Sequence, residues 1–496
     1  MSIYPACLVG CLLTHGVHRV LGVDYPSMLC IFRNGNNRWA NNLDVSNLLS
    51  LATIAKIRSH RRFVDTMYVA YTQHALRLAR FIPRLLAASK EDTLQMIARH
   101  YHTFNRFFTD AYCYGWLPLG TEGLASNFSG LLVAFLVDRI ENRRLSISVG
   151  ECFSALTAST SLTVRDREQL DLHKILRWWK QKSSEGEQQN KRLMIKLRRH
   201  YALYRWMSFD YEGPELPFVY FQSRFFDLVR SKQSPDVIVK HIRQRIREVR
   251  DRRKKLWNIL ELKSAPEYAY LFRIAQRFGD WKSEQQELFF QSYYAIDYLF
   301  DCLAQKVGIK KELLRYIFPE EMDVFIKRRR PSIAILAKRR RHCVVIYKKG
   351  LARCFIGSDA DATVTLHVAP DEVLSKSSLR GQVAYPGKVE GIVKIVNAPR
   401  DMRKMRNGNI LVSSKTNPNL LIAMRCAAAI VTDYGGLTSH AAILARELHT
   451  PTIVGTRYAT KVLRDGMRVV VDAHNGIVRR LRPLPPRNAT RMIQNQ

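Results

Sequence analysis

The stretch Asp433-Tyr-Gly-Gly-Leu-Thr-Ser-His-Ala-Ala-Ile-Leu-Ala-Arg-Glu447 decides the fold of the C-terminal part of this chain. The apolar residues before it predict a buried strand that ends at Thr432. Gly435 and Gly436 then allow a tight turn and a close approach of the backbone to a ligand. The sequence therefore predicts a strand, a glycine turn and a helix in direct succession.

The helix start carries the residue with the most chemistry. Thr438 or Ser439 is a suitable N-cap, which places His440 in the first turn, where backbone N–H groups lack partners within the helix. The positive helix end opposes protonation of the imidazole, so more of the ring is neutral and nucleophilic near pH 7. The same end can hold a dianionic phosphoryl group. A lone histidine at a helix start is more often held by local hydrogen bonds. The functional interpretation of His440 therefore depends on the whole sequence from Asp433 to Glu447.

The residues around this stretch predict a compact mixed β/α unit. Apolar and β-branched runs bounded by turn residues indicate strands, and Asn475-Gly476 is a strong hairpin signal. The predicted elements are a strand through Val389–Ile395, strands at Asn409–Ser413 and Ala427–Thr432, a helix at Ser439–Leu448, and strands at Thr452–Val454, Arg468–Asp472 and Ile477–Arg480.

The chain before this unit has a different pattern. Apolar residues recur at helical spacing over most of residues 44–305, and strands are predicted at 343–347 and 351–356. We therefore expect a multidomain α + β/α chain: a mainly α-helical region over 1–330, a short β-rich connector over 331–378, the β/α domain over 379–484, and a tail over 485–496.

The string from Gly435 to Glu447 resembles the phosphohistidine signature of the PEP-utilising enzymes, a family with phosphoenolpyruvate synthase, pyruvate phosphate dikinase and rifampicin phosphotransferase. The family pattern Gly-Gly-x-Thr-Ser-His-Ala-Ala-Ile-x-Ala-Arg-Glu is matched at every named position. The resemblance covers about residues 379–484 and implies a β/β/α swivelling domain in which His440 accepts the phosphoryl group. One departure is that Asn417 and Asn419 flank Pro418, where the family commonly has acidic residues.

Five further residues are second-rank candidates, with two interpretations each. They either shape the loop and contact phosphate, or they cap the helix and pack it on the strand; Arg446 leans toward a structural ion pair. The five are Gly435, Gly436, Thr438, Ser439 and Arg446.

A complete phosphoryl-transfer cycle needs parts that the sequence does not display. We find no glycine-rich ATP-grasp phosphate loop and no βα-repeat long enough for a phosphoenolpyruvate barrel, which needs about 250 residues. The resemblance then implies ATP and Mg²⁺ bound by a separate nucleotide-binding (ATP-grasp) chain, with a further acceptor enzyme. The helical region resembles more loosely the helical segment of synthase-like proteins. A degenerate regulatory relative is the alternative.

The formal net charge is +36, from 79 Lys and Arg against 43 Asp and Glu. Such a surplus favours anionic partners. Lys327–Arg330, Lys338–Arg341 and an arginine-rich helix near 243–255 could contact a phosphate backbone, although a solvated face is the commoner outcome. The competing functions are thus a phosphotransferase component, a basic nucleic-acid-binding protein, and a regulatory protein docking an acidic partner.

Other patterns give weaker expectations. The nine cysteines form no CxxC pair, which favours a reducing compartment without a zinc or disulfide framework. His100, His102 and His200 are expected to pack rather than bind metal. The apolar stretch Ala6–Leu13 is too short to span a bilayer, so we expect a buried segment in a cytoplasmic protein.

Overall fold

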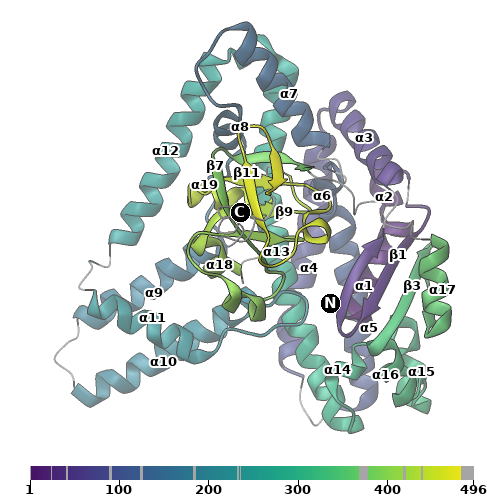
Figure 1. The fold of residues 1–496 in the computed structure, drawn as a ribbon. Helices are drawn as coiled ribbons and strands as arrows, with labels where there is room; N and C mark the ends of the chain where they lie inside the picture. Colours follow the sequence, from purple (N-terminus) through teal and green to yellow (C-terminus); the bar gives the residue numbers. More distant parts are fainter. Residues whose placement is uncertain are drawn as a thin grey trace, which may run out of the picture. The chain divides into compact units, whose positions relative to one another are not determined.

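A computed structural model describes residues 2–23, 25–40, 43–88, 92–122, 127–181, 186–231, 234, 236–367, 378–416, 420–436 and 439–481; His440 is described in its backbone alone. The chain divides into two compact units. The first comprises residues 1–145 and 152–369, and the second residues 146–151 and 370–496 (Figure 1).

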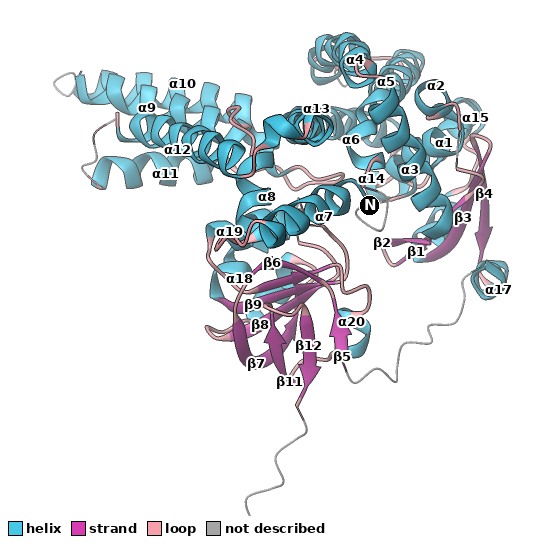
Figure 2. Ribbon diagram, turned by 90° about the horizontal axis from the view of Figure 1, so that it is seen from above, coloured by secondary structure: helices cyan, strands magenta, loops and turns pink. Residues whose placement is uncertain are grey.

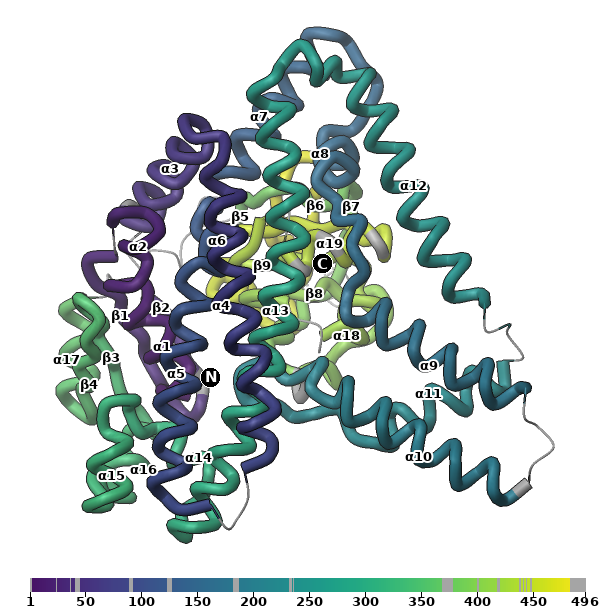
Figure 3. The backbone as a smooth tube through the Cα atoms, turned by 180° about the vertical axis from the view of Figure 1, so that it is seen from behind, coloured from purple at the N-terminus to yellow at the C-terminus, as the bar shows by residue number. Residues whose placement is uncertain are grey.

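The first unit is built on a helical bundle. The 42-residue helix α13 (Pro266–Val307) packs against α4 (Phe63–Leu86) and α5 (Leu94–Gly115), as the tube in Figure 3 shows. Its apolar face, including Leu288 and Phe300, is buried, as the helical spacing in the sequence predicts. The remaining helices of the unit's first part are α1 (Ile3–Cys11), α2 (His18–Leu21), α3 (Leu43–Ser59), α6 (Leu117–Gly120), α7 (Asn127–Asn142) and, from residue 152 onward, α8 (Val149–Thr157).

The predicted buried segment at the N-terminus is confirmed. Helix α1 and the turn after it bury Ala6, Cys7, Leu12 and Leu13. Among the described residues, no helix combines the length and the apolar character that crossing a membrane requires.

A four-stranded antiparallel sheet joins the two ends of the first unit. Its order is β2 (Asn36–Ala40), β1 (Met28–Arg33), β3 (His342–Lys348) and β4 (Leu351–Ile356). The two later strands confirm the prediction for residues 343–356. The sequence interpretation missed β1 and β2, and β3 and β4 pair with these N-terminal strands rather than standing apart as a connector. The pairing buries Leu29 against Val344.

A group of four helices extends from this unit, with α9, α10, α11 and α12 side by side in Figure 2. The core between α9, α10 and α11 contains Leu172, Leu176, Leu193, Leu197 and Phe225, and α12 packs against α9. Their bounds are α9 (Val164–Gln181), α10 (Gly186–Tyr204), α11 (Phe218–Arg230) and α12 (Val237–Ile259); the unit is completed by α14 (Lys311–Leu314), α15 (Met322–Arg328), α16 (Ile333–Arg341) and α17 (Ser358–His367).

The second unit contains an eight-stranded sheet, in the order β5-β12-β11-β7-β8-β9-β10-β6 (Figure 2). Strands β7, β8, β9 and β10 run parallel to one another, and the outer strands pair antiparallel. The bounds are β5 (Ser378–Arg380), β6 (Gln382–Tyr385), β7 (Lys388–Ile395), β8 (Asn409–Ser413), β9 (Ala427–Thr432), β10 (Thr452–Val454), β11 (Arg468–Asp472) and β12 (Ile477–Arg480), with helices α18 (Leu421–Cys426), α19 (His440–Glu447) and α20 (Ala459–Val462).

Both faces of the sheet are covered at the parallel strands β8, β9 and β10, which explains the continuous apolar sequences of these three strands. Side chains alternate along a strand, so Ile410 and Val412 of β8 pack with Val462 of α20. Leu411, between them, packs on the opposite face with Met424 of α18 and Leu444 of α19. The predicted strands and helix of this unit are confirmed.

Candidate phosphohistidine site

The candidate site lies at the carboxyl edge of the parallel strands, where ligands of open α/β sheets commonly bind. The segments that follow β8, β9 and β10 are joined there by backbone hydrogen bonds. Asp433 N donates to Ser413 O (3.0 Å), and Thr456 N donates to Thr432 O (2.9 Å). The start of the glycine turn is therefore held on both sides by its neighbours in the sheet.

Asp433, the first residue after β9, anchors this segment. Its side chain is 3% exposed, and its carboxylate accepts hydrogen bonds from Thr460 N (2.9 Å) and from the Thr460 hydroxyl. Burial raises the pKa of the Asp433 carboxyl, although the hydrogen bonds from Thr460 oppose that rise. Because Thr460 lies in α20, the aspartate fixes the turn to the helix on the other side of the sheet.

Gly435 makes the turn that leads from β9 into α19. Its φ of +121° lies in a region that other residues rarely adopt. A Cβ added there would lie 2.9 Å from the Cβ and the Oγ of Ser439. The position therefore requires glycine for two reasons: its backbone conformation, and the close approach of Ser439, which caps the helix.

Ser439 is the N-cap of α19, one of the two candidates that the sequence offered. Its hydroxyl oxygen accepts a hydrogen bond from Ala442 N (3.4 Å), and its own N–H donates to Gly436 O (3.0 Å). His440 is consequently the first residue of the helix. Thr438, the other candidate, lies outside the described residues, as do Asn417, Pro418 and Asn419.

Arg446 lies in the last turn of α19. The sequence favours a structural ion pair for this residue, and the described residues do not provide one. Its Nε and Nη2 atoms are buried without a hydrogen-bond partner, and no described carboxylate pairs with it. Burial lowers the pKa of Arg446 to about 10, so the guanidinium is still charged at pH 7. A partly buried cation with two nitrogens that the described residues leave without a partner is a candidate anion contact.

The other histidines singled out in the sequence lie in separate surroundings. His102 Nε2 lies 2.8 Å from Asp323, whereas His200 Nε2 lies 3.0 Å from Glu168 within the four-helix group. Arg224 also donates to Glu168 (2.6 Å). No cluster of three or more metal-binding side chains occurs in the described part of the chain.

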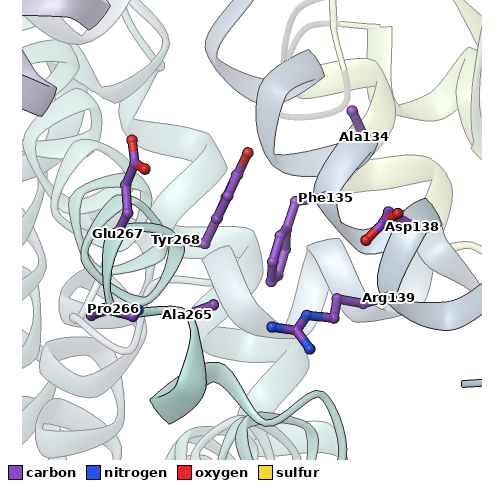
Figure 4. A pocket seen from close by; sticks show the side chains of 8 residues that line it. All are labelled: Ala134, Phe135, Asp138, Arg139, Ala265, Pro266, Glu267 and Tyr268. Atoms are coloured by element: carbon purple, nitrogen blue, oxygen red, sulfur yellow. The ribbon is translucent and has the colours of Figure 1, made fainter. Parts of the chain in front are cut away.

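One open pocket of about 650 Å³ lies in the first unit, between α7 and the start of α13 (Figure 4). Its aromatic wall is the stacked pair Phe135 and Tyr268, with ring centroids 4.0 Å apart. Arg139 and Asp138 line one side. None of the residues that the sequence assigns to phosphoryl chemistry lines it.

Residues 405–476 match the family model described as PEP-utilising enzyme, mobile domain. The C-terminal domain is related to that family. The matched part of the mobile domain runs from just before β8 to the turn before β12, and it includes the whole glycine turn and α19.

Relatives with curated descriptions agree with this relation. A probable phosphoenolpyruvate synthase of Archaeoglobus fulgidus is 50% identical over 108 residues, which are 22% of this chain and 14% of that protein. The uncharacterized phosphotransferase YvkC of Bacillus subtilis is 27% identical over 255 residues, 48% of this chain and 30% of that protein. This chain thus spans less than a third of the length of either relative.

A solved structure, the holo form of aconitase X from Thermococcus kodakaraensis, aligns with 22% of this chain and 100% of its own, at 20% identity and a TM-score of 0.17.

Proposed function

We propose that this chain is a component of a phosphotransferase and that its mobile domain carries a phosphoryl group on His440. The observation that carries the proposal is the start of α19. The signature histidine is the first residue of a serine-capped helix at the carboxyl edge of a parallel sheet. Glycine conformation and the Asp433 anchor hold the turn before it.

The proposed chemistry follows from this placement. An imidazole nitrogen of His440 attacks the phosphorus of the donor; an N–P bond forms and the P–O bond to the donor's leaving group breaks. A second transfer to the acceptor restores the neutral imidazole. Free N–H groups and the helix dipole at the start of α19 would stabilise the phosphoryl dianion, by about 0.3–2 kcal/mol depending on its burial.

Arg446 supports the same proposal. Two nitrogens of the partly buried Arg446 guanidinium have no hydrogen-bond partner among the described residues, which destabilises the resting domain. A phosphoryl oxygen is the kind of acceptor that arginine binds well. We assign Gly435, Gly436, Thr438 and Ser439 to the shape of the loop and Arg446 to the anion.

The donor and the acceptor are assigned to other chains. In this proposal the domain predicted over residues 379–484 swings as a β/β/α unit between two active sites. ATP with Mg²⁺ would be bound by a separate nucleotide-binding chain.

Labelling of the full-length chain tests the proposal. The chain is incubated with an extract of its own cells and ³²P-labelled ATP or phosphoenolpyruvate, then recovered by an affinity tag. We expect label that is stable in alkali and lost in acid, as a phosphoramidate is, and that is absent from His440→Gln. The matched control is His474→Gln, because His474 is an exposed histidine of the same unit; it should label normally. Equal labelling of His440→Gln and the wild type would refute the proposal.

A further inference from the structure

Helix α12 displays a straight row of cations that the phosphotransferase proposal does not use. Its 23 residues contain nine Lys and Arg against two acidic residues. At 100° per residue, five of these cations fall within about 80° of one another on the helix surface. We call these five residues the α12 row; they are Lys240, Arg243, Arg247, Arg250 and Lys254.

The side chains of the α12 row make no ion pairs within the described part of the protein. All five side chains are exposed, and none has an acidic partner among the described residues. Other arginines of the same helix are used internally: Arg245 pairs with Asp166 at 2.8 Å, and Arg253 donates to the backbone oxygens of Ala155 and Ala158. The helix therefore separates structural cations from spare ones.

The cations of the α12 row repel one another. Residues three and four apart are neighbours on a helix, and like charges there are destabilising. Arg243 and Arg247, Arg247 and Arg250, and Arg250 and Lys254 are such pairs. Of the two acidic residues of the helix, Glu248 accepts a hydrogen bond from Gln244 (2.8 Å). Asp251 lies four residues after Arg247 and three before Lys254, so it offsets part of the charge, but it forms no ion pair with either among the described residues. A linear anion that contacts all five positions would remove this repulsion.

We infer that the α12 row binds the sugar-phosphate backbone of a nucleic acid. The row extends over about 21 Å, since 14 residues at 1.5 Å separate its ends, and a nucleic acid presents phosphates at regular spacing along such a length. Three of the five residues are arginines, whose planar fork matches phosphate oxygens.

The surroundings of the row argue against two other polyanions. Every exposed residue from 240 to 255 is polar or charged, so this surface offers nothing apolar to insert into a lipid bilayer. An acidic protein would need carboxylates in a matching straight row. The opposite face of α12, with Ile242 and Leu256, is buried, so the helix cannot enter a major groove fully. Binding is therefore independent of base sequence.

The test measures binding of a fluorescent 20-base-pair DNA duplex, the matching RNA duplex and the single strands to the full-length chain from 50 to 200 mM salt. On the DNA duplex, five phosphate contacts give a slope of log Kobs against log salt of about −4.5, or roughly a 500-fold loss across that range; on a single strand the slope is about −3.5. The variant K240Q/R243Q/R247Q/R250Q/K254Q should lose this slope, and R247Q alone should lower it by about 0.9.

A charge-matched control separates the row from the general positive field. K327Q/R328Q/R330Q/K338Q/R340Q removes five exposed cations of α15, α16 and the residues between them, which also lack acidic partners among the described residues. It should keep at least four-fifths of the slope. Thermal unfolding checks folding, and the α12 variant should melt at or above the wild-type temperature because the repulsion is gone. Equal losses in both variants, absence of nucleic-acid binding, or preference for poly-aspartate or phosphatidylserine vesicles would overturn the inference.

Discussion

Replacing Gly435 by alanine tests the glycine turn most directly. The alanine must adopt a φ near +121°, and its Cβ would lie 2.9 Å from two side-chain atoms of Ser439. The first effect strains the backbone, and the second displaces the cap of α19. Both act within a few residues of His440, so phosphoryl labelling should be lost as well.

Gly466 provides a control for the loss of stability in Gly435→Ala. Gly466 has a φ of +90°, but a Cβ there would meet nothing within 4 Å. Backbone strain of this kind costs about 1–3 kcal/mol, and both substitutions share it. Only Gly435→Ala also loses the Ser439 cap, worth about 1 kcal/mol. We therefore expect about 2–4 kcal/mol for Gly435→Ala and about 1–3 kcal/mol for Gly466→Ala.

Hydrogen exchange read by mass spectrometry measures this difference in the full-length chain. Peptides covering β9 and α19 should exchange roughly fivefold faster in Gly435→Ala than in Gly466→Ala, since 1.4 kcal/mol corresponds to a factor of ten. All seven tryptophans lie in the first unit, so the tryptophan emission should be the same in both variants. Equal exchange in the two variants, with normal labelling of Gly435→Ala, would refute the reasoning.

Three further predictions concern charged side chains. Arg446→Met should raise the stability of the mobile domain by about 1–3 kcal/mol, because it removes a partly buried charge that no described carboxylate pairs with, yet lower phosphoryl labelling; unchanged labelling would remove Arg446 from the anion site. Arg339→Ala should cost about 2–3 kcal/mol in urea unfolding, since it removes a buried arginine from a half-buried ion pair with Glu321, whereas exposed Arg340→Ala should stay within about 0.5 kcal/mol. Burial alone would raise the pKa of Glu168, but hydrogen bonds from its basic neighbours hold it below its usual value. Ionised Glu168 therefore stabilises the folded state above pH about 4.3, and this stabilisation is lost as the pH falls through the folded pKa. Glu168→Gln should unfold more easily at pH 7, and its acid unfolding, followed by tryptophan fluorescence, should depend less on pH.

The mobile domain was predictable from the sequence because local and global signals agree there. Strands such as Asn409–Ser413 and Ala427–Thr432 are short apolar runs between turn residues, and their observed bounds are the same. His440 was located by its motif and by a suitable cap at Ser439. Asp433 as an anchor was not predicted, because its partner Thr460 is 27 residues away and approaches it only through the sheet.

The N-terminal hairpin shows where the sequence interpretation failed. Asn34 and Gly35 both have positive φ, as a two-residue hairpin turn requires, and Asn-Gly is the strongest short signal for one. The mainly α-helical region expected over residues 1–330 includes this signal, so the prediction is wrong there. The basic run Lys338–Arg341 is uniform in its sequence, but its members differ in burial: Arg339 is buried against Glu321 and Tyr316. Which cation of a run faces inward depends on the turn of the helix and on its neighbours.

The ladder between β1 and β3 has a consequence for how the first unit is made. Met28 pairs with Tyr347, so the N-terminal hairpin emerges from the ribosome long before its partner strand exists. At about 5–20 residues per second, the intervening chain takes roughly 15–60 s to synthesise. For that time one edge of β1 has only water or another polypeptide to bind. Any nascent fragment that stops short of residue 342 keeps this edge open, which makes the early chain a natural client for chaperones.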